Sequence, residues 1–122
     1  MAGKKDFLKE KSYAFAIRVV RMVQYLQQNK GEHVLTKQVL RSGTAIGAMI
    51  NEAEFAQSDA DYIHKLSIAL KEANETKYWL HILHDTEYID DEPFKSIEND
   101  CKELIALLVS SIKTLKNKLA AK

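Results

Sequence analysis

The sequence predicts an all-α protein, an antiparallel up-down-up-down four-helix bundle. The first observation is periodicity, because apolar residues recur every three to four positions in four successive stretches of the chain. The second is composition: 46% of the residues are hydrophobic and 29% charged, with only 4 Gly and 1 Pro, as is typical of a soluble helical protein. The length of 122 residues suits one core. We expect a basic N-terminal segment over 1-11 and a single four-helix-bundle domain over 12-122.

The first two helices are predicted from their apolar spacing and from the residues at their ends. The first is expected from about Ser12 to Asn29, followed by Gly31 as a C-terminal stop. The eleven residues before it either extend this helix or form a frayed end. The second is expected from about Thr36, as its N-cap, to Ala56. Its core stripe is predicted to consist of Leu35, Val39, Gly43, Ile46, Ile50 and Ala53.

Two glycines lie inside the second predicted helix, at Gly43 and Gly47. Each costs a helix roughly 1 kcal/mol relative to alanine. They are four residues apart and small side chains surround them, so we expect them to let a neighbouring helix approach closely. The pattern of a phosphate-binding loop, G-x-x-x-x-G-K-S/T after a strand, is not met here.

The third and fourth helices are marked by their first residues. Ser58 followed by Asp61 fits a capping box, and the helix that starts there is expected to end at about residue 84 or 85. Asp91 followed by Pro93 marks the start of the fourth helix, because proline is tolerated in a first turn. Its apolar residues follow four-and-three spacing: Phe94, Ile97, Cys101, Leu104, Leu108, Ile112, Leu115 and Leu119.

The sides of the second and third helices that face away from their core stripes carry unexpectedly many small or apolar residues. We predict that they form an oligomer interface, since contiguous exposed apolar patches usually mark contact sites. The charged residues among them are interpreted as a structural ion-pair network that fixes the register of the helices. The alternative is that one bundle has wide apolar faces and that Trp79 folds over a helix edge. The predicted residues are Arg41, Ala45, Ala48, Glu52, Ile68, Glu72, Glu75, Trp79 and Ile82.

The net charge is only +1, but it is unevenly distributed. Residues 1–41 hold 9 basic and 3 acidic side chains, whereas residues 42–92 hold 3 basic and 11 acidic ones. In an up-down-up-down bundle the start of the first helix and the end of the fourth meet at one pole, which predicts a basic pole and a nucleic-acid-binding surface. The alternative is a pair of solvated basic tails, since the pI of about 7.8 is low for a nucleic-acid-binding protein. The candidate residues are Lys4, Lys5, Lys9, Lys11, Arg18, Arg21, Lys113, Lys116 and Lys118.

Catalytic and metal sites are not predicted. A di-metal bundle needs Glu-x-x-His on two helices, and the sequence has no such motif. The lone Cys101 lies in an apolar register without a patterned His partner, and no serine lies in a G-x-S-x-G motif. We therefore expect a protein without enzymatic activity, metal or cofactor. The absence of a signal peptide, of a membrane span and of paired cysteines predicts a cytoplasmic protein that does not bind membranes.

Three segments of the chain resemble a known family: QVLRSGTAIGAMINEA at 38–53, SDADYIHKLSIALKEANETKYWL at 58–80 and ELIALLVSSIKTLK at 103–116. They are similar to the bacterial four-helix-bundle proteins encoded in intervening sequences of large-subunit ribosomal RNA genes. The similarity covers about residues 12–118. Ala45 and Met49 depart from the family pattern, which often has Ser and Asn at these places. The matching residues are Gln38, Arg41, Ile46, Ile50, Asn51, Glu52, Ala53, Ala69, Glu72, Glu75, Thr76, Trp79 and Leu80.

The resemblance implies a left-handed four-helix bundle that assembles as a ring-shaped homopentamer. It also implies a relation to the accessory variability proteins of diversity-generating retroelements, which resemble basic-surfaced adaptors for a reverse transcriptase and nucleic acid. Two hypotheses follow. The first is a non-catalytic oligomeric adaptor that binds RNA or DNA and a nucleic-acid enzyme. The second is a structural protein-protein assembly module that binds no nucleic acid.

Overall fold

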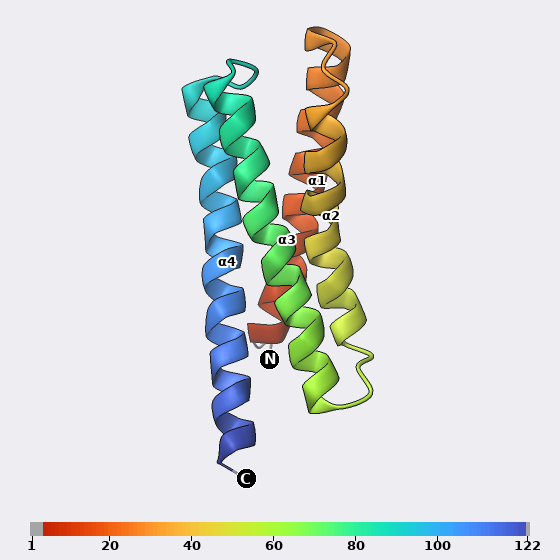
Figure 1. The fold of residues 1–122 in the computed structure, drawn as a ribbon, viewed down its shortest axis with the longest axis vertical. Coiled ribbons are helices and arrows are strands. Elements are labelled where there is room, and N and C mark those ends of the chain that lie inside the picture. Colours follow the sequence, from red (N-terminus) through yellow and green to blue (C-terminus); the bar gives the residue numbers. More distant parts are fainter. Residues whose placement is uncertain (1–3, 122) are drawn as a thin grey trace.

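The computed structural model describes residues 4–121, with side chains from residue 6 onward. It contains four α-helices: α1 (Lys4–Lys30), α2 (Leu35–Ala53), α3 (Asp59–Asp85) and α4 (Asp91–Ala120). Consecutive helices run in opposite directions, so both chain ends lie at the same pole (Figure 1). The helices in contact are α1 with α2, α2 with α3, α3 with α4 and α4 with α1, while the backbones of the diagonal pairs lie farther apart. The predicted four-helix bundle is confirmed.

The core contains one apolar stripe from each helix. The predicted stripe residues of α2 are buried except Leu35, which is half-buried. On α3 the buried stripe, which the three-to-four spacing of the sequence also predicts, includes Leu66, Ala69, Ala73, Thr76, Leu80 and Leu83. Helical period therefore identified the buried faces correctly. The largest fully buried side chains are Leu8, Phe15, Val19, Leu26, Thr36, Val39, Ile46, Leu66, Leu80, Leu83, Leu104 and Leu108.

Helix α1 includes residues before Ser12, which is the alternative in which this segment extends the helix. It begins at Lys4 rather than at about Ser12, and it ends at Lys30. Leu8 is only 2% exposed and Ser12 only 1%, so the first turns of the helix contribute to the core. Burial of Leu8 gives these turns a tertiary contact, which the charged residues around it conceal in the sequence. The basic segment expected over 1–11 is therefore helical from Lys4 onward.

The start of α2 differs from the prediction in its capping residue. Thr36 is not the N-cap: it is fully buried, and its hydroxyl donates to the backbone carbonyl of Glu32 at 2.9 Å. The carboxylate of Glu32 accepts hydrogen bonds from the backbone N–H groups of Val34, Leu35 and Thr36 at 3.0, 2.7 and 2.8 Å. Burial opposes ionisation of Glu32, but these donors outweigh it and lower its pKa. A buried anion thus satisfies the free N–H groups of the helix start.

The ends of the other helices agree with the sequence more closely. The backbone N–H of Asp61 donates to the Ser58 hydroxyl at 3.0 Å, and the Asp61 carboxylate accepts from the N–H of Gln57 at 3.2 Å. This is the predicted capping interaction, with the return bond displaced by one residue. Helix α4 begins at Asp91 as predicted. Helix α2 ends at Ala53, before the predicted Ala56.

The two glycines of α2 face α1, but only one of them lies in a very close contact. A Cβ atom placed on Gly43 would lie 2.9 Å from both γ-methyl carbons of Val19 on α1. A Cβ atom on Gly47 would have its nearest neighbours at 3.4 Å, in the backbone and hydroxyl of Ser12, which is an ordinary contact. Close helix approach therefore requires glycine at position 43, and the contact at Gly47 does not.

The pair of glycines gives a matched test of this contact. Gly43→Ala is expected to lower the free energy of unfolding by about 1 to 3 kcal/mol, because the added methyl group overpacks against Val19. Gly47→Ala is expected to raise it by up to about 1 kcal/mol, because alanine favours the helix and the site has room. Urea unfolding followed by circular dichroism measures both changes. A Gly43→Ala variant that is as stable as the wild type, or more stable, would show that the α1–α2 contact does not depend on Gly43.

Candidate functional site

Three of the basic residues predicted on α1 are paired with carboxylates. The ammonium of Lys9 lies 3.0 Å from Glu54, and that of Lys11 lies 2.5 Å from Glu103. The guanidinium of Arg18 lies 2.6 Å from Asp100 and also donates to the Ser96 hydroxyl at 3.1 Å. These pairs lie across the α1–α2 and α1–α4 contacts, so their cations are already neutralised by the same molecule.

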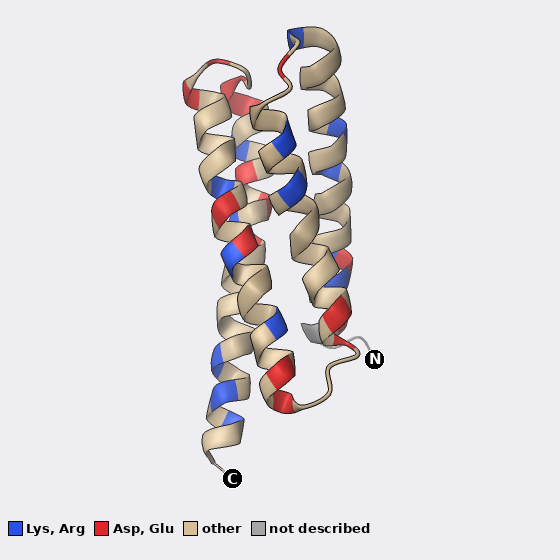
Figure 2. Cartoon of the chain, turned by 45° about the vertical axis from the view of Figure 1, so that its right-hand side comes forward, with Lys and Arg blue, Asp and Glu red and all other residues tan. Residues whose placement is uncertain are grey.

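The other predicted basic residues lie apart from these pairs. Arg21 is exposed on α1, whereas Lys113, Lys116 and Lys118 are exposed on the last turns of α4. Lys118 also lines a cavity of about 440 Å³ that includes Leu8. The side chains of Lys4 and Lys5 lie outside the described residues. The predicted basic residues therefore do not form one cluster, although those near the end of α4 lie together at one pole (Figure 2).

Helix α4 separates its charges by side. It carries five lysines and five acidic residues, so its net charge is zero. Asp100 and Glu103 face α1, where they pair with Arg18 and Lys11. Glu98 is only 8% exposed and contacts the His81 imidazole of α3. The carboxylates beyond the first turn of α4 are thus used in contacts within the chain.

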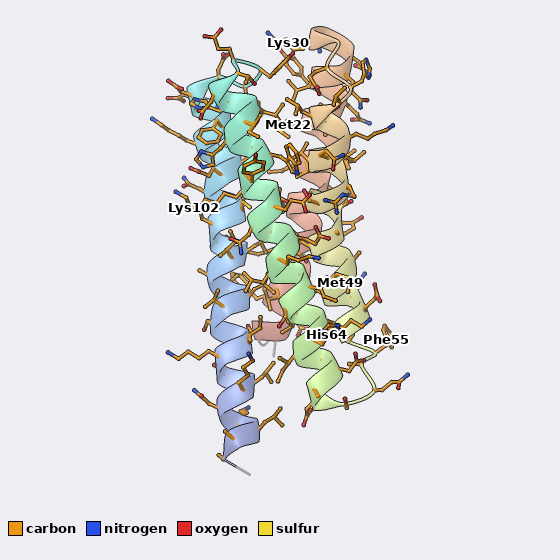
Figure 3. The ribbon with its side chains drawn as sticks, viewed as in Figure 1. Met22, Lys30, Met49, Phe55, His64 and Lys102 are labelled. Carbon is orange, nitrogen blue, oxygen red and sulfur yellow. The ribbon has the colours of Figure 1, made fainter. Side chains whose placement is uncertain are left out.

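Four of the five lysines of α4 lie on a different side from Asp100 and Glu103, whereas Glu98 lies beside these lysines. Lys95, Lys102, Lys113 and Lys116 are exposed, and their spacings of seven, eleven and three residues place them along one side of the helix. We call these four residues the lysine face. Lys102 lies 3.4 Å from Glu98, while no described carboxylate lies within 4.0 Å of the other three. Figure 3 shows Lys102 pointing away from the bundle. The lysine face spans about 31 Å at 1.5 Å per residue.

Sequence reasoning found half of this face. Lys113 and Lys116 were predicted as binding residues, but Lys95 and Lys102 were not, because neighbouring acidic residues cancel them in a count along the chain. The angular position of each residue around the helix axis is the signal that distinguishes these lysines from the neighbouring acidic residues. Lysines at this spacing share one side of a helix, whereas Asp100 and Glu103 fall on another.

The charged residues predicted at an oligomer interface form a network within the chain. Arg41 of α2 pairs with Glu72 of α3 at 3.2 Å and also with Glu75, whose carboxylate accepts a hydrogen bond from Trp79 Nε1 at 3.0 Å. The hydrogen bond from Trp79, followed by that from Arg41, lowers the pKa of Glu75, and the contact with Glu75 raises the pKa of Arg41. Lys65 and Glu52 form a second pair at 3.3 Å. Both pairs connect α2 with α3.

The apolar members of the same prediction remain at the surface. Trp79 packs against the core, as the alternative interpretation expected, whereas Ala45, Ile68 and Ile82 are half-buried and Ala48 is exposed. Two large side chains flank them at the ends of α2. Val34 is 75% exposed and Phe55 is 83% exposed, and Phe55 points outward beside the α2–α3 connection (Figure 3). The outer surface of α2 and α3 thus combines a satisfied ionic network with uncovered apolar groups.

Histidine and cysteine side chains lie in contacts with the rest of the chain. His84 lies between Asp85 at 2.9 Å and Asp91 at 2.5 Å, and its ring stacks on Phe94 with 4.2 Å between the centroids. Cys101 is fully buried, and its Sγ donates to the Ala73 carbonyl at 3.3 Å. Burial raises the pKa of the Cys101 thiol to about 12, so it is not a nucleophile near neutral pH.

The described residues offer neither a metal site nor a membrane-spanning helix. Between residues 4 and 121, no group of three or more His, Cys, Asp or Glu side chains is arranged to hold a metal ion. In the same part of the chain, none of the helices has the length and apolar character needed to cross a membrane.

The comparisons with known proteins agree with this architecture. The sequence model of one family, the 23S rRNA-intervening sequence proteins, matches residues 5–110, which is most of the chain. The chain belongs to this family. No curated protein matches it. A similar solved structure is the crystal structure of a protein with unknown function from the S23 ribosomal protein family of Bacteroides thetaiotaomicron. It is 55% identical with a TM-score of 0.90, and the match covers 91% of this chain and 99% of the other.

The surroundings of His84 predict how the stability of this 23S rRNA-intervening sequence protein depends on pH. Contact with Asp91, and secondarily with Asp85, raises the pKa of His84, while His84 lowers the pKa of Asp91. The stability that His84 contributes is therefore complete below the pKa of about 6.5 that it has in the unfolded chain. It is lost as pH rises through the higher pKa of His84 in the folded protein. The stability that Asp91 contributes is present above about pH 4, and it is lost on acidification through the lower pKa of Asp91 in the folded protein.

NMR titration of the imidazole is expected to give His84 a pKa above 6.5, and Asp91→Asn is expected to bring that pKa down. In unfolding experiments, the loss of stability caused by His84→Gln should be greatest between about pH 4 and 6.5. A His84 pKa at or below 6.5 would contradict the observed pairing.

Proposed function

We propose that this protein is a non-catalytic nucleic-acid-binding module, which holds an RNA or DNA segment and presents it to a partner enzyme. The family name points to the intervening sequence of 23S ribosomal RNA as one candidate ligand. The resemblance to the accessory proteins of retroelements suggests a reverse transcriptase as the class of partner. The protein itself would supply binding and positioning, and the chemistry would belong to the partner.

The separation of charge on α4 carries this proposal. The carboxylates Glu98, Asp100 and Glu103 are occupied by contacts within the chain, whereas the lysine face is exposed to solvent. Lysine ammonium groups attract phosphate without regard to base sequence, and binding is favoured by release of condensed counterions. The nearly neutral chain can therefore have a local phosphate-binding surface, despite its pI of about 7.8. A ring of identical chains would repeat this surface around the assembly and increase its avidity.

Charge reversal tests the lysine face. The double variant Lys113→Glu and Lys116→Glu is expected to weaken binding of a fluorescent nucleic acid at least tenfold at low salt, because two phosphate contacts are lost and two repulsions are added. The matched control is Lys30→Glu with Lys37→Glu, which changes the net charge equally at exposed positions on α1 and α2. Fluorescence anisotropy measures both affinities. An equal loss in the two variants, or binding insensitive to salt, would contradict a specific role for the lysine face.

The second candidate function is a structural module that assembles with copies of itself or with a protein partner. The uncovered apolar groups on α2 and α3 favour it, because Val34 and Phe55 are among the most exposed large hydrophobic residues of the described chain. The two functions use different surfaces, since the lysine face lies on α4. An oligomer that also binds nucleic acid combines them.

Light scattering tests the assembly. The resemblance predicts a particle of about five times the chain mass of 13.9 kDa. Ala48→Glu with Phe55→Ser is expected to reduce the particle mass, because both residues are exposed and their change removes apolar contact area without disturbing the core. The charge-reversal variant of the lysine face is expected to keep its full mass. A wild-type protein that stays monomeric at every concentration would exclude self-assembly.

A further inference from the structure

We infer that the ligand of the lysine face is a nucleic-acid duplex, bound along its phosphate backbone and without selection of base sequence. This inference rests on the proposed function, because it names the class of nucleic acid that the same surface accepts. Three features of the face support it: its linear geometry, the absence of exposed aromatic rings from its helix, and the chemistry of its cations.

The geometry of the face matches a stiff, linear ligand. Lys95, Lys102, Lys113 and Lys116 lie on one uninterrupted helix, α4, which has 30 residues. The row of ammonium groups is therefore nearly straight and about 31 Å long, which corresponds to roughly nine base pairs at 3.4 Å per pair. A duplex presents one phosphate charge per 1.7 Å of axis and is already stiff. A single strand has a lower charge density and must lose conformational freedom to lie straight along the row.

The face lacks the rings that proteins use to bind single strands. Single-strand binding depends on bases that stack on aromatic side chains, with contributions of about 1 to 3 kcal/mol per base. The exposed aromatic residues of the described chain are on other elements: Phe7, Tyr13, Tyr25, Phe55 and Tyr78.

The exposed tyrosine of α3 lies against a neighbouring ring. The ring of Tyr78 meets that of Trp79 edge-on, with centroids 5.2 Å apart, and Trp79 bonds to the network between α2 and α3. On α4 itself, other exposed residues on this side carry no aromatic ring, and the amide side chains among them can donate hydrogen bonds to phosphate. They include Asn99, Ala106, Val109 and Asn117.

The cations of the face favour phosphate over base edges. All four are lysines, whose ammonium groups act as compact point charges. Reading of guanine in a major groove relies mainly on bidentate contacts, for which the arginine guanidinium has the fitting planar geometry. The two arginines on the neighbouring helix do not add such contacts to the face: Arg18 is paired with Asp100, and Arg21 projects from α1.

The test compares duplex and single-stranded ligands of equal length. Fluorescence anisotropy would measure the affinity of the whole protein for 20-residue single strands of RNA and DNA, and for the corresponding 20-base-pair duplexes, in the same salt. At least one duplex is expected to bind tenfold or more tightly than either single strand, and a duplex of scrambled sequence is expected to bind equally well. For the DNA duplex, four phosphate contacts predict a slope of log affinity against log salt of about −3.6, and Lys113→Glu with Lys116→Glu should reduce its magnitude by about 2.

The outcomes separate the inference from the function on which it rests. Tighter binding of single strands than of duplexes would overturn the duplex inference, while nucleic-acid binding itself would stand. Loss of affinity on scrambling the duplex would overturn recognition through phosphate alone. No binding to any of the four ligands at low salt would overturn both the inference and the proposed function. The control variant with Lys30→Glu and Lys37→Glu is expected to retain the duplex preference, and its loss there would assign the effect to net charge rather than to the lysine face.

Discussion

Burial of one apolar stripe fixes the rotation of each helix about its own axis, and the chemistry of the surface depends on that rotation. With Leu104 and Leu108 of α4 in the core, Asp100 and Glu103 must face α1, while Lys102 must face outward. A helix that is neutral in sequence thereby presents a basic side to solvent. The hydrophobic contribution of the core, about 25 cal/mol per Å² of buried apolar surface, far exceeds that of the exposed ion pairs. The core therefore sets the positions in which the charged residues meet.

The contacts between helices differ in kind, and they determine which charged residues are paired and which stay accessible at the surface. The α1–α2 contact is close at Gly43, where Val19 leaves no room for a side chain. The α1–α4 contact is bridged by ion pairs that use the basic residues of α1. The α2–α3 contact combines the buried hydroxyls of Ser42 and Thr76, 2.9 Å apart, with the exterior network around Arg41. The outer side of α4 takes part in none of these contacts, so its lysines stay accessible.

The proposed roles use surfaces that do not compete. Apolar groups on α2 and α3 would face a neighbouring subunit, and the lysine face of α4 would remain accessible to a nucleic acid. This arrangement suits an adaptor, because assembly repeats a weak phosphate-binding surface at fixed spacing. The buried thiol of Cys101 and the structural contacts of His84 show that two chemically reactive side-chain types serve packing and helix connection here. Under the proposed function, affinity for nucleic acid would depend on salt and on the number of subunits.

The sequence by itself determined the number of helices, their buried faces and the cap at Ser58, because these follow from local periodicity and short-range hydrogen bonds. It also placed Lys113 and Lys116 in the candidate site. Only the tertiary structure showed that the carboxylate of Glu32, and not the side chain of Thr36, accepts hydrogen bonds from the free backbone N–H groups at the start of α2. It also showed that Leu8 brings the first turns of α1 into the core. Only the tertiary structure decided which charges remain free. Pairing between residues far apart in the chain depends on how the helices are rotated and packed, and no local pattern records that arrangement.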